Sequence, residues 1–190
     1  MASTLVCLPG AELELLVLAA GHRVCAAVDL ESGALVQAHW PDPIQPLPPM
    51  ALARARIGDD GERVDPIRPE AVPLSGPPAA TGQMPRRRAE RWLRPLLHPA
   101  DDHLFGLPGP TIPYWSLSGD RPSLALVAPP SRPILVGNRC RFVWCRLRHD
   151  LPVLPTARAS APARPRRLVI TLSAPRDGHC YKVVAGLLPG

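Results

Sequence analysis

The sequence predicts a mainly β protein built of small barrels, and three features of the chain support this prediction. Proline makes up 27 of the 190 residues. Each proline inside a helix removes a hydrogen bond and costs about 3 kcal/mol, which excludes a helical bundle. Short apolar runs are separated by turn residues, as in small barrels, and no rhythm of alternating strands and helices indicates a parallel sheet. The length suits one large domain or two small ones.

The first half of the chain carries clear strand signals. Apolar runs predict strands over residues 4–8, 13–20 and 50–57, although a helical turn is also compatible with the second run. Between them, residues 22–40 contain two strand-like runs joined around "ESG". Gly33 can take a positive φ there, so we predict a hairpin. The proline-rich stretch 41–49 is expected to form an extended loop.

The second half predicts one short helix and a second β-region. A helical pattern runs from residue 85, and Pro95 should end it near Arg94. Strand-like runs then lie within residues 123–130, 132–144, 149–154, 168–173 and 180–188. The basic, low-complexity stretch 155–167 is predicted to be a mobile loop or linker.

Charge is unevenly distributed along the chain. Residues 1–75 hold five arginines against ten acids, whereas residues 76–190 hold 17 basic residues against six acids. Clustered arginine neutralises phosphates and releases counterions, so the second half is predicted to face a polyanion. The alternative is that the excess charge only keeps the protein in solution, and a G+C-rich coding sequence also explains the preference for arginine over lysine.

Two runs interleave arginine with aromatic residues, as single-strand-binding surfaces do. The candidate contacts are Arg86, Arg87, Arg88, Arg91, Trp92 and Arg94 in the first run, and Arg139, Arg141, Arg146 and Arg148 in the second. Lys182, the only lysine, is a further candidate. In the second run Phe142 and Trp144 share a strand face with Cys140, opposite Arg139 and Arg141. They either stack on bases or belong to the core.

The sequence carries little that points to catalysis, a cofactor or a metal. Common nucleotide-binding, zinc-protease and serine-hydrolase motifs are absent. His22 with Cys25, and His179 with Cys180, lack the paired cysteines of a zinc site. Five scattered cysteines do not resemble a secreted disulfide framework. Two glutamates interrupt the first apolar stretch, so we expect a cytoplasmic protein with reduced thiols and no membrane anchor.

Several segments resemble the bacterial dual OB-containing domain family. They are "LVCL" and "RVCAAVDLESGALVQ" near the start, "RWLRPLLHP" in the middle, and "RFVW", "HDLPV" and "GHCYKVVAGLLP" in the second half. The last segment is similar to the family's C-terminal "G-x-C-Y-K-L-V-A" pattern. Departures are Ala34-Leu35 in place of a tryptophan after the hairpin glycine, and the proline-rich stretches 41–85 and 155–166.

The resemblance implies two OB-like β-barrels joined by a proline-rich connector with one short helix. The expected parts are an N-terminal barrel over 1–82, a basic helical connector over 83–115 and a C-terminal barrel over 116–190. It also implies a nucleic-acid-binding protein of bacterial conflict or defence systems. Our leading hypothesis is a non-enzymatic protein that binds single-stranded DNA or RNA, or a structured RNA end. In the closing strand, Cys180, Lys182 and Val184 would share one face.

Two other functions remain open at this point. The acidic first half, the basic second half and "PIQPLPP" also suit an adaptor that binds protein partners, because extended proline-rich segments dock into aromatic grooves. An enzyme subunit that completes an active site elsewhere, with His179 or Cys180 at its edge, has less support.

Overall fold

The computed structural model describes residues 8–59, 68–117 and 121–190. It is mainly β, as predicted, and it divides into two compact units, Met1–Leu96 and Leu97–Gly190. The predicted boundary at residue 82 is therefore too early. Residues 83–96 belong to the first unit and 97–115 to the second, so the predicted connector is divided between the two units. The strand predicted over 4–8 lies, apart from Leu8, outside the described residues.

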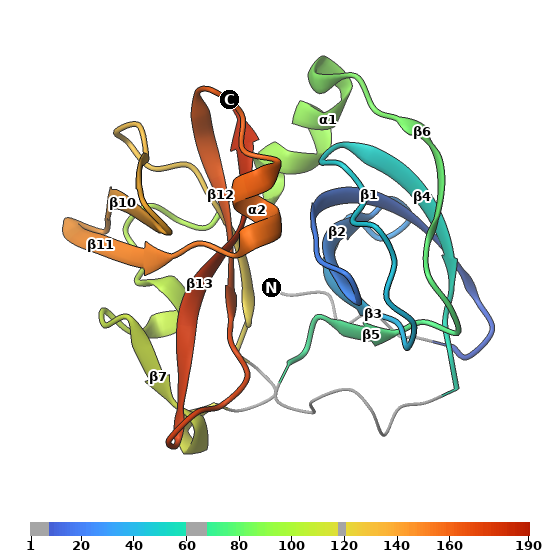
Figure 1. The fold of residues 1–190 in the computed structure, drawn as a ribbon, viewed down its shortest axis with the longest axis horizontal. Helices are drawn as coiled ribbons and strands as arrows, with labels where there is room; N and C mark the ends of the chain where they lie inside the picture. The colour runs from blue at the N-terminus through green and yellow to red at the C-terminus, as the bar shows by residue number, and fades with distance from the viewer. Residues whose placement is uncertain (1–7, 60–67, 118–120) are drawn as a thin grey trace. The chain divides into compact units, whose positions relative to one another are not determined.

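The first unit is one six-stranded sheet (Figure 1). Its strands are β1 (Glu12–Ala20), β2 (Val24–Asp29), β3 (Leu35–His39), β4 (Ala51–Arg56), β5 (Ala71–Pro73) and β6 (Ala79–Gln83). They are paired in the order β5-β3-β2-β1-β4-β6. Every pairing is antiparallel except that of β3 with β5. The segment 13–20 is thus a strand, and 50–57 does return to the sheet.

This sheet curls until its strand ends meet. Ile57, directly after β4, forms an antiparallel bridge with Leu74, directly after β5. Backbone bonds of 3.0 Å from Gly58 N–H to the Pro73 carbonyl and from Ser75 N–H to the Arg56 carbonyl reinforce the bridge. The ends of β4 and β5 are therefore hydrogen-bonded to each other as well as to their neighbours in the sheet.

The predicted hairpin is confirmed as β2 and β3. Gly33 has φ +72° in the connecting turn and donates its N–H to the Asp29 carbonyl at 2.8 Å. The Asp29 carboxylate accepts the Ser32 N–H at 3.0 Å, as aspartate does in many turns. Leu15, Val17 and Ala27 are fully buried and belong to the apolar core inside the curled sheet.

Helix α1 (Arg86–Leu93) follows β6 and is the predicted short helix. It ends at Leu93, and a 3-10 turn over Arg94–Leu96 follows, as expected from Pro95. Only Ala89 and Leu93 are buried on the helix. Burial of these two side chains anchors an element that is otherwise covered with arginine.

The second unit contains two sheets (Figure 1). Its strands are β7 (Thr111–Pro113), β8 (Leu124–Val127), β9 (Ile134–Val136), β10 (Arg139–Trp144), β11 (Leu147–Pro152), β12 (Pro165–Leu172) and β13 (His179–Pro189). The first sheet has the order β7-β13-β12-β8 and the second β11-β10-β9. All of the strand runs predicted after residue 123 are therefore present, and residues 101–115 contribute β7 and two 3-10 turns.

The two sheets are joined where β11 ends. Val153 forms a parallel bridge with Val184 of β13, and Leu154 N–H donates to the Val184 carbonyl at 3.0 Å. Helix α2 (Pro155–Ala159) begins immediately afterwards and buries Ala157. The prediction of a mobile loop over 155–167 is wrong, because this stretch forms α2 and the start of β12.

Candidate nucleic-acid interface

The candidate interface of the second unit lies on the outer face of the β9-β10-β11 sheet. Side chains alternate along β10 as predicted: Cys140, Phe142 and Trp144 are buried, while Arg139 and Arg141 are exposed. The alternation follows from the two-residue period of a strand, since one face covers the core and the other meets solvent.

A tight turn aims a third arginine outward. Trp144 and Leu147 are the last paired residues of β10 and β11, so Cys145 and Arg146 form a two-residue hairpin connection. Both have positive φ, +46° and +62°, as a type I′ turn requires. Asparagine and glycine are the usual residues in such a turn, so this conformation is strained for Cys145 and Arg146. The Cys145 thiol contacts the Asp101 carbonyl oxygen at 3.0 Å.

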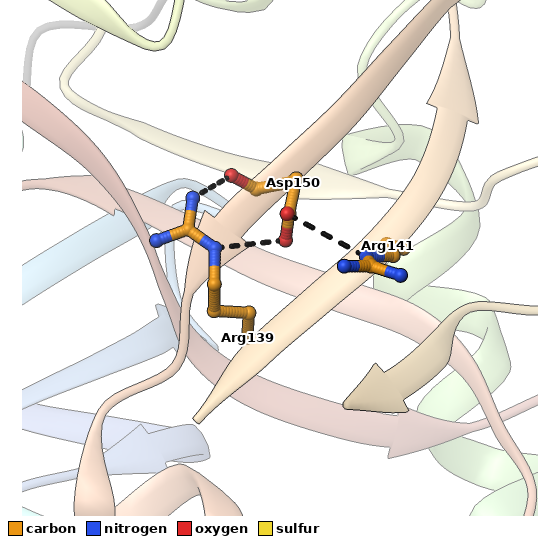
Figure 2. A network of polar contacts seen from close by, with 3 residues as sticks. All are labelled: Arg139, Arg141 and Asp150. Atoms are coloured by element: carbon orange, nitrogen blue, oxygen red, sulfur yellow. Dashed lines mark hydrogen bonds and ion pairs between the residues drawn. The ribbon is translucent and has the colours of Figure 1, made fainter. Parts of the chain in front are cut away.

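One carboxylate organises two of the arginines (Figure 2). Asp150 on β11 lies directly opposite Arg141 on β10. Its Oδ1 is 2.9 Å from Arg139 Nε, and its Oδ2 is 3.5 Å from Arg141 Nε. All three side chains are 41–59% solvent-accessible, so these ion pairs add little stability. Their effect is to orient two guanidinium groups on the same face of the sheet.

Beside this network the surface is hollowed, with a cavity of about 410 Å³. Its charged lining consists of Arg132, Arg141 and Arg148 against Asp150 alone, and Ile134 and Val143 supply apolar lining. We call this site the arginine hollow. Arg132 is held by a 2.6 Å bond from its Nη2 to the Ala163 carbonyl. The excess of guanidinium groups makes the arginine hollow suited to an anionic ligand with an apolar part.

Phe142 and Trp144 belong to the core and are not available to bases. Only 4% and 2% of their surface is exposed. Trp144 donates its indole N–H to the Asp102 carbonyl at 3.0 Å, and the Phe142 ring stacks on His149 at a centroid distance of 5.2 Å. Of the two alternatives for these aromatics, the structure supports the core.

The prediction that Lys182 is a surface contact is wrong. Its side chain is fully buried, and its ammonium group donates to the Leu107 carbonyl. Burial lowers the pKa of Lys182 from 10.5 to about 8. Burial also lowers the pKa of His149, and the charge of Lys182 lowers it further. The alternation of Cys180, Lys182 and Val184 on one face is confirmed, and that face is the buried one.

The other predicted arginines lie in the first unit, four of them on α1 and Arg94 in the 3-10 turn that follows it. Arg86, Arg87, Arg88, Arg91 and Arg94 are all exposed. No acid occupies the first turn of the helix, so three of these cations face the positive end of the helix dipole. Trp92 is half-buried, and its ring lies 3.9 Å from the position that a Cβ on Gly33 would occupy. It therefore packs beside the β2–β3 turn.

Sequence reasoning missed four residues of the arginine hollow, Arg132, Ile134, Val143 and Asp150. Of these, Arg132 and Ile134 flank Pro133, and Ile134 begins the three-residue strand β9. The available signal was the run "SRPILV", in which one proline separates an arginine from three apolar residues that the structure leaves exposed.

Other chemistry finds no support in the described parts of the chain. No group of three or more histidine, cysteine or acidic residues there could hold a metal ion. Burial raises the pKa of the Cys25 thiol to about 12 and that of Cys140 to about 11, which makes both poor nucleophiles. Cys180 is fully buried. Among the described helices, none is both long and apolar enough to cross a membrane.

The proline-rich segment contributes to the first core. Ile44 and Leu47 of "PIQPLPP" pack partly buried against it, and Ile44 N–H donates to the His22 carbonyl at 2.9 Å. An aromatic groove on another protein would bind these two apolar side chains. Both are already packed against the core of this protein.

Comparison with known proteins finds no relatives. No protein-family model matches the chain, and no curated protein or solved structure is significantly similar to it.

Proposed function

We propose that this is a non-enzymatic nucleic-acid-binding protein made of two OB-like units, as in the dual OB-containing domain family of bacterial conflict systems. The observation that carries the proposal is the arginine hollow on the outer face of β10 and β11. Three guanidinium groups face one carboxylate there. Guanidinium groups bind phosphate oxygens in a bidentate manner and are the usual backbone contacts in nucleic-acid complexes.

The topology of the first unit supports the OB-like architecture. The order β4-β1-β2-β3 within its sheet is that of a Greek key. Addition of β5 beside β3, with its end bonded to the end of β4, gives five strands in a partly closed arrangement, and β6 adds a sixth beside β4. An OB-fold is a five-stranded, partly open Greek-key barrel.

The second unit follows the same plan. Apart from the short β7, which pairs with the first residues of β13, the sheets and the Val153–Val184 bridge together give the order β9-β10-β11-β13-β12-β8. If β8 and β9 are two parts of one bent first strand, β10, β11, β12 and β13 are strands two to five. The third and fifth strands then pair in parallel in both units, as β3–β5 and as β11–β13.

In the proposed OB-like unit, with β8 and β9 as one bent first strand, β10 and β11 correspond to the second and third strands. OB-folds bind oligonucleotides and oligosaccharides on that face and in the adjoining loops. The arginine hollow lies on the same face, and the charge favours an oligonucleotide. The second unit contains 12 basic and five acidic residues.

The test is the salt dependence of binding by the full chain. We expect Arg132→Ala, Arg141→Ala and Arg148→Ala together to reduce the slope of log affinity against log salt by about two, since each single-strand phosphate contact contributes about 0.7. A control with the same net charge carries Arg23→Ala, Arg121→Ala and Arg166→Ala, at exposed arginines outside the hollow. Equal losses in the two triple variants would show that only net charge matters and would refute a binding role for the hollow.

A further inference from the structure

All of the exposed aromatic side chains of the protein are found in one part of the second unit. The chain has four tryptophans, two tyrosines and two phenylalanines, and all of these fall within the described ranges. Only Tyr114, Trp115 and Tyr181 are exposed, with 37%, 74% and 40% of their surface accessible. Aromatic side chains dominate core energetics. This chain has few aromatic residues, yet three of them are exposed in the same part of the second unit. A cluster of exposed apolar side chains is typical of a binding surface.

The Trp115 ring lies beside the start of β13, which carries His179 and Tyr181. The Trp115 ring meets His179 edge-on, with centroids 5.6 Å apart and an interplanar angle of 68°. His179 and Tyr181 alternate on β13, so they share a face and are about 6.6 Å apart along the strand. We call Trp115, His179 and Tyr181 the aromatic row.

The turn before β13 positions Trp115. Asp177 and Gly178 have φ of +50° and +75°, and Arg176 and His179 exchange backbone hydrogen bonds of 2.8 and 3.0 Å across them. Tyr114 N–H donates to the Gly178 carbonyl at 2.8 Å. A Cβ on Gly178 would be only 3.1 Å from the Trp115 ring, so glycine lets the indole lie against the turn. The indole is therefore held by its neighbours while most of its surface faces solvent.

We infer that the aromatic row stacks unpaired nucleobases, which makes single-stranded nucleic acid the ligand class of the second unit. The inference rests on the proposed function, because the arginine hollow supplies the phosphate contacts. Arg176 Nε is 3.8 Å from Asp177 Oδ2 in the turn beside the aromatic row. Because these two charges balance, the row offers a ligand mainly ring surface. Bases of a duplex are already stacked on each other and cannot reach such rings, whereas those of a single strand can.

The charge of the unit favours this ligand over a neutral proline-rich peptide, which aromatic surfaces also bind. A peptide would leave the excess of seven positive charges in the second unit without a partner. A single strand uses both features, because it presents a charged backbone and apolar base faces on the same chain.

The experiment compares two oligonucleotides of about 20 nucleotides, one oligothymidylate and one with abasic sites throughout, by anisotropy with the full chain. We expect the wild type to bind oligothymidylate more tightly than the abasic strand. Trp115→Ala and Tyr181→Ala should each weaken oligothymidylate binding about 5- to 150-fold, the range for one stacked base, and leave abasic binding unchanged. Trp115→Phe should retain most of the affinity. Leu154→Ala, which changes a side chain with 37% exposure away from the row, is the matched control.

The outcomes separate this inference from the proposed function. Salt-sensitive binding that is equal for both strands, and unchanged in Trp115→Ala, overturns the aromatic row and leaves the arginine hollow standing. Failure of the wild type to bind either strand overturns both. Thermal unfolding of each variant checks its fold, and Trp115→Phe keeps the test valid if Trp115→Ala unfolds.

Discussion

The α1 arginines and those of the β10–β11 sheet have the same sequence signature, arginine interleaved with aromatic residues, but different surroundings. On α1 the guanidinium groups project from one short helix that has no acid in its first turn. On the sheet, Asp150 orients Arg139 and Arg141, and a cavity lies beside them. Composition alone therefore does not distinguish a charged helix from a preorganised anion site. The two are distinguished by the orientation of the guanidinium groups and by the hollow beside them, because preorganisation reduces the entropy lost on binding.

The largest expected difference between the two runs is the loss of protein stability when the tryptophan of each run is replaced by alanine. We expect Trp144→Ala to reduce the free energy of unfolding by about 3–5 kcal/mol, because it empties a core position and removes the bond to the Asp102 carbonyl. Trp92→Ala should cost less, since Trp92 is half-buried. Urea unfolding measures both values. Equal costs would contradict the assignment of Trp144 to the core.

Lys182 offers a contrast with the surface arginines. Since its pKa falls from 10.5 to about 8 on folding, the unfolded chain binds the proton more tightly, and the penalty is fully present below pH 8. Stability should therefore rise between pH 8 and 10.5. Lys182→Met should stabilise the protein at pH 7 by at most about 3 kcal/mol, and this gain should disappear near pH 10.5. Urea unfolding at several pH values tests this, and a gain that does not change with pH would be contrary to the account.

The α1 arginines should contribute less to binding than the hollow. Arg86→Ala, Arg88→Ala and Arg91→Ala together should lower the salt slope by less than the triple variant of the hollow does. The same changes should stabilise the protein by about 1 kcal/mol, because alanine favours helix and two of the removed cations lie in the first turn. Anisotropy and thermal unfolding measure the two effects. A larger loss of slope than at the hollow would place the main interface on α1.

The smallest effect is expected at the β10–β11 turn. Arg146→Gly should stabilise the protein by about 1 kcal/mol, because glycine accepts φ +62° without strain. Arg148→Gly removes the same charge at a strand position and should instead destabilise. Thermal unfolding measures the stability of the two variants. Destabilisation by Arg146→Gly would show that the turn is not strained.

The sequence predicted strands where side chains alternate and missed elements that lack alternation. In residues 139–144 the two-residue period identified both faces correctly, but only the curl of the sheet shows that Phe142 and Trp144 face inward. Strand β6, "AATGQ", is exposed throughout and is held by pairing with β4, so no alternation of apolar side chains indicates a strand there. Helix α2 has five residues and a single buried contact, Ala157, which no apolar period reveals.

The candidate site was predictable in part for the same reason. Arg139 and Arg141 are exposed, as their positions in the strand pattern suggested, and Arg146 and Arg148 are exposed as well. The burial of Lys182 could have been inferred, since it shares a strand face with Cys180 and Val184. Arg132 joins the hollow only through tertiary structure. Trp115 and Tyr181 are 66 positions apart in the chain, and the pairing of β7 with β13 brings their regions together.

The most direct test of the central claim is the salt slope for oligothymidylate binding by the wild type, the hollow triple variant and its control of equal charge. The account predicts steep salt dependence in the wild type and the control, and a slope smaller by about two when Arg132, Arg141 and Arg148 are alanine. Identical slopes in all three proteins would contradict the claim that these arginines hold the backbone of a nucleic acid.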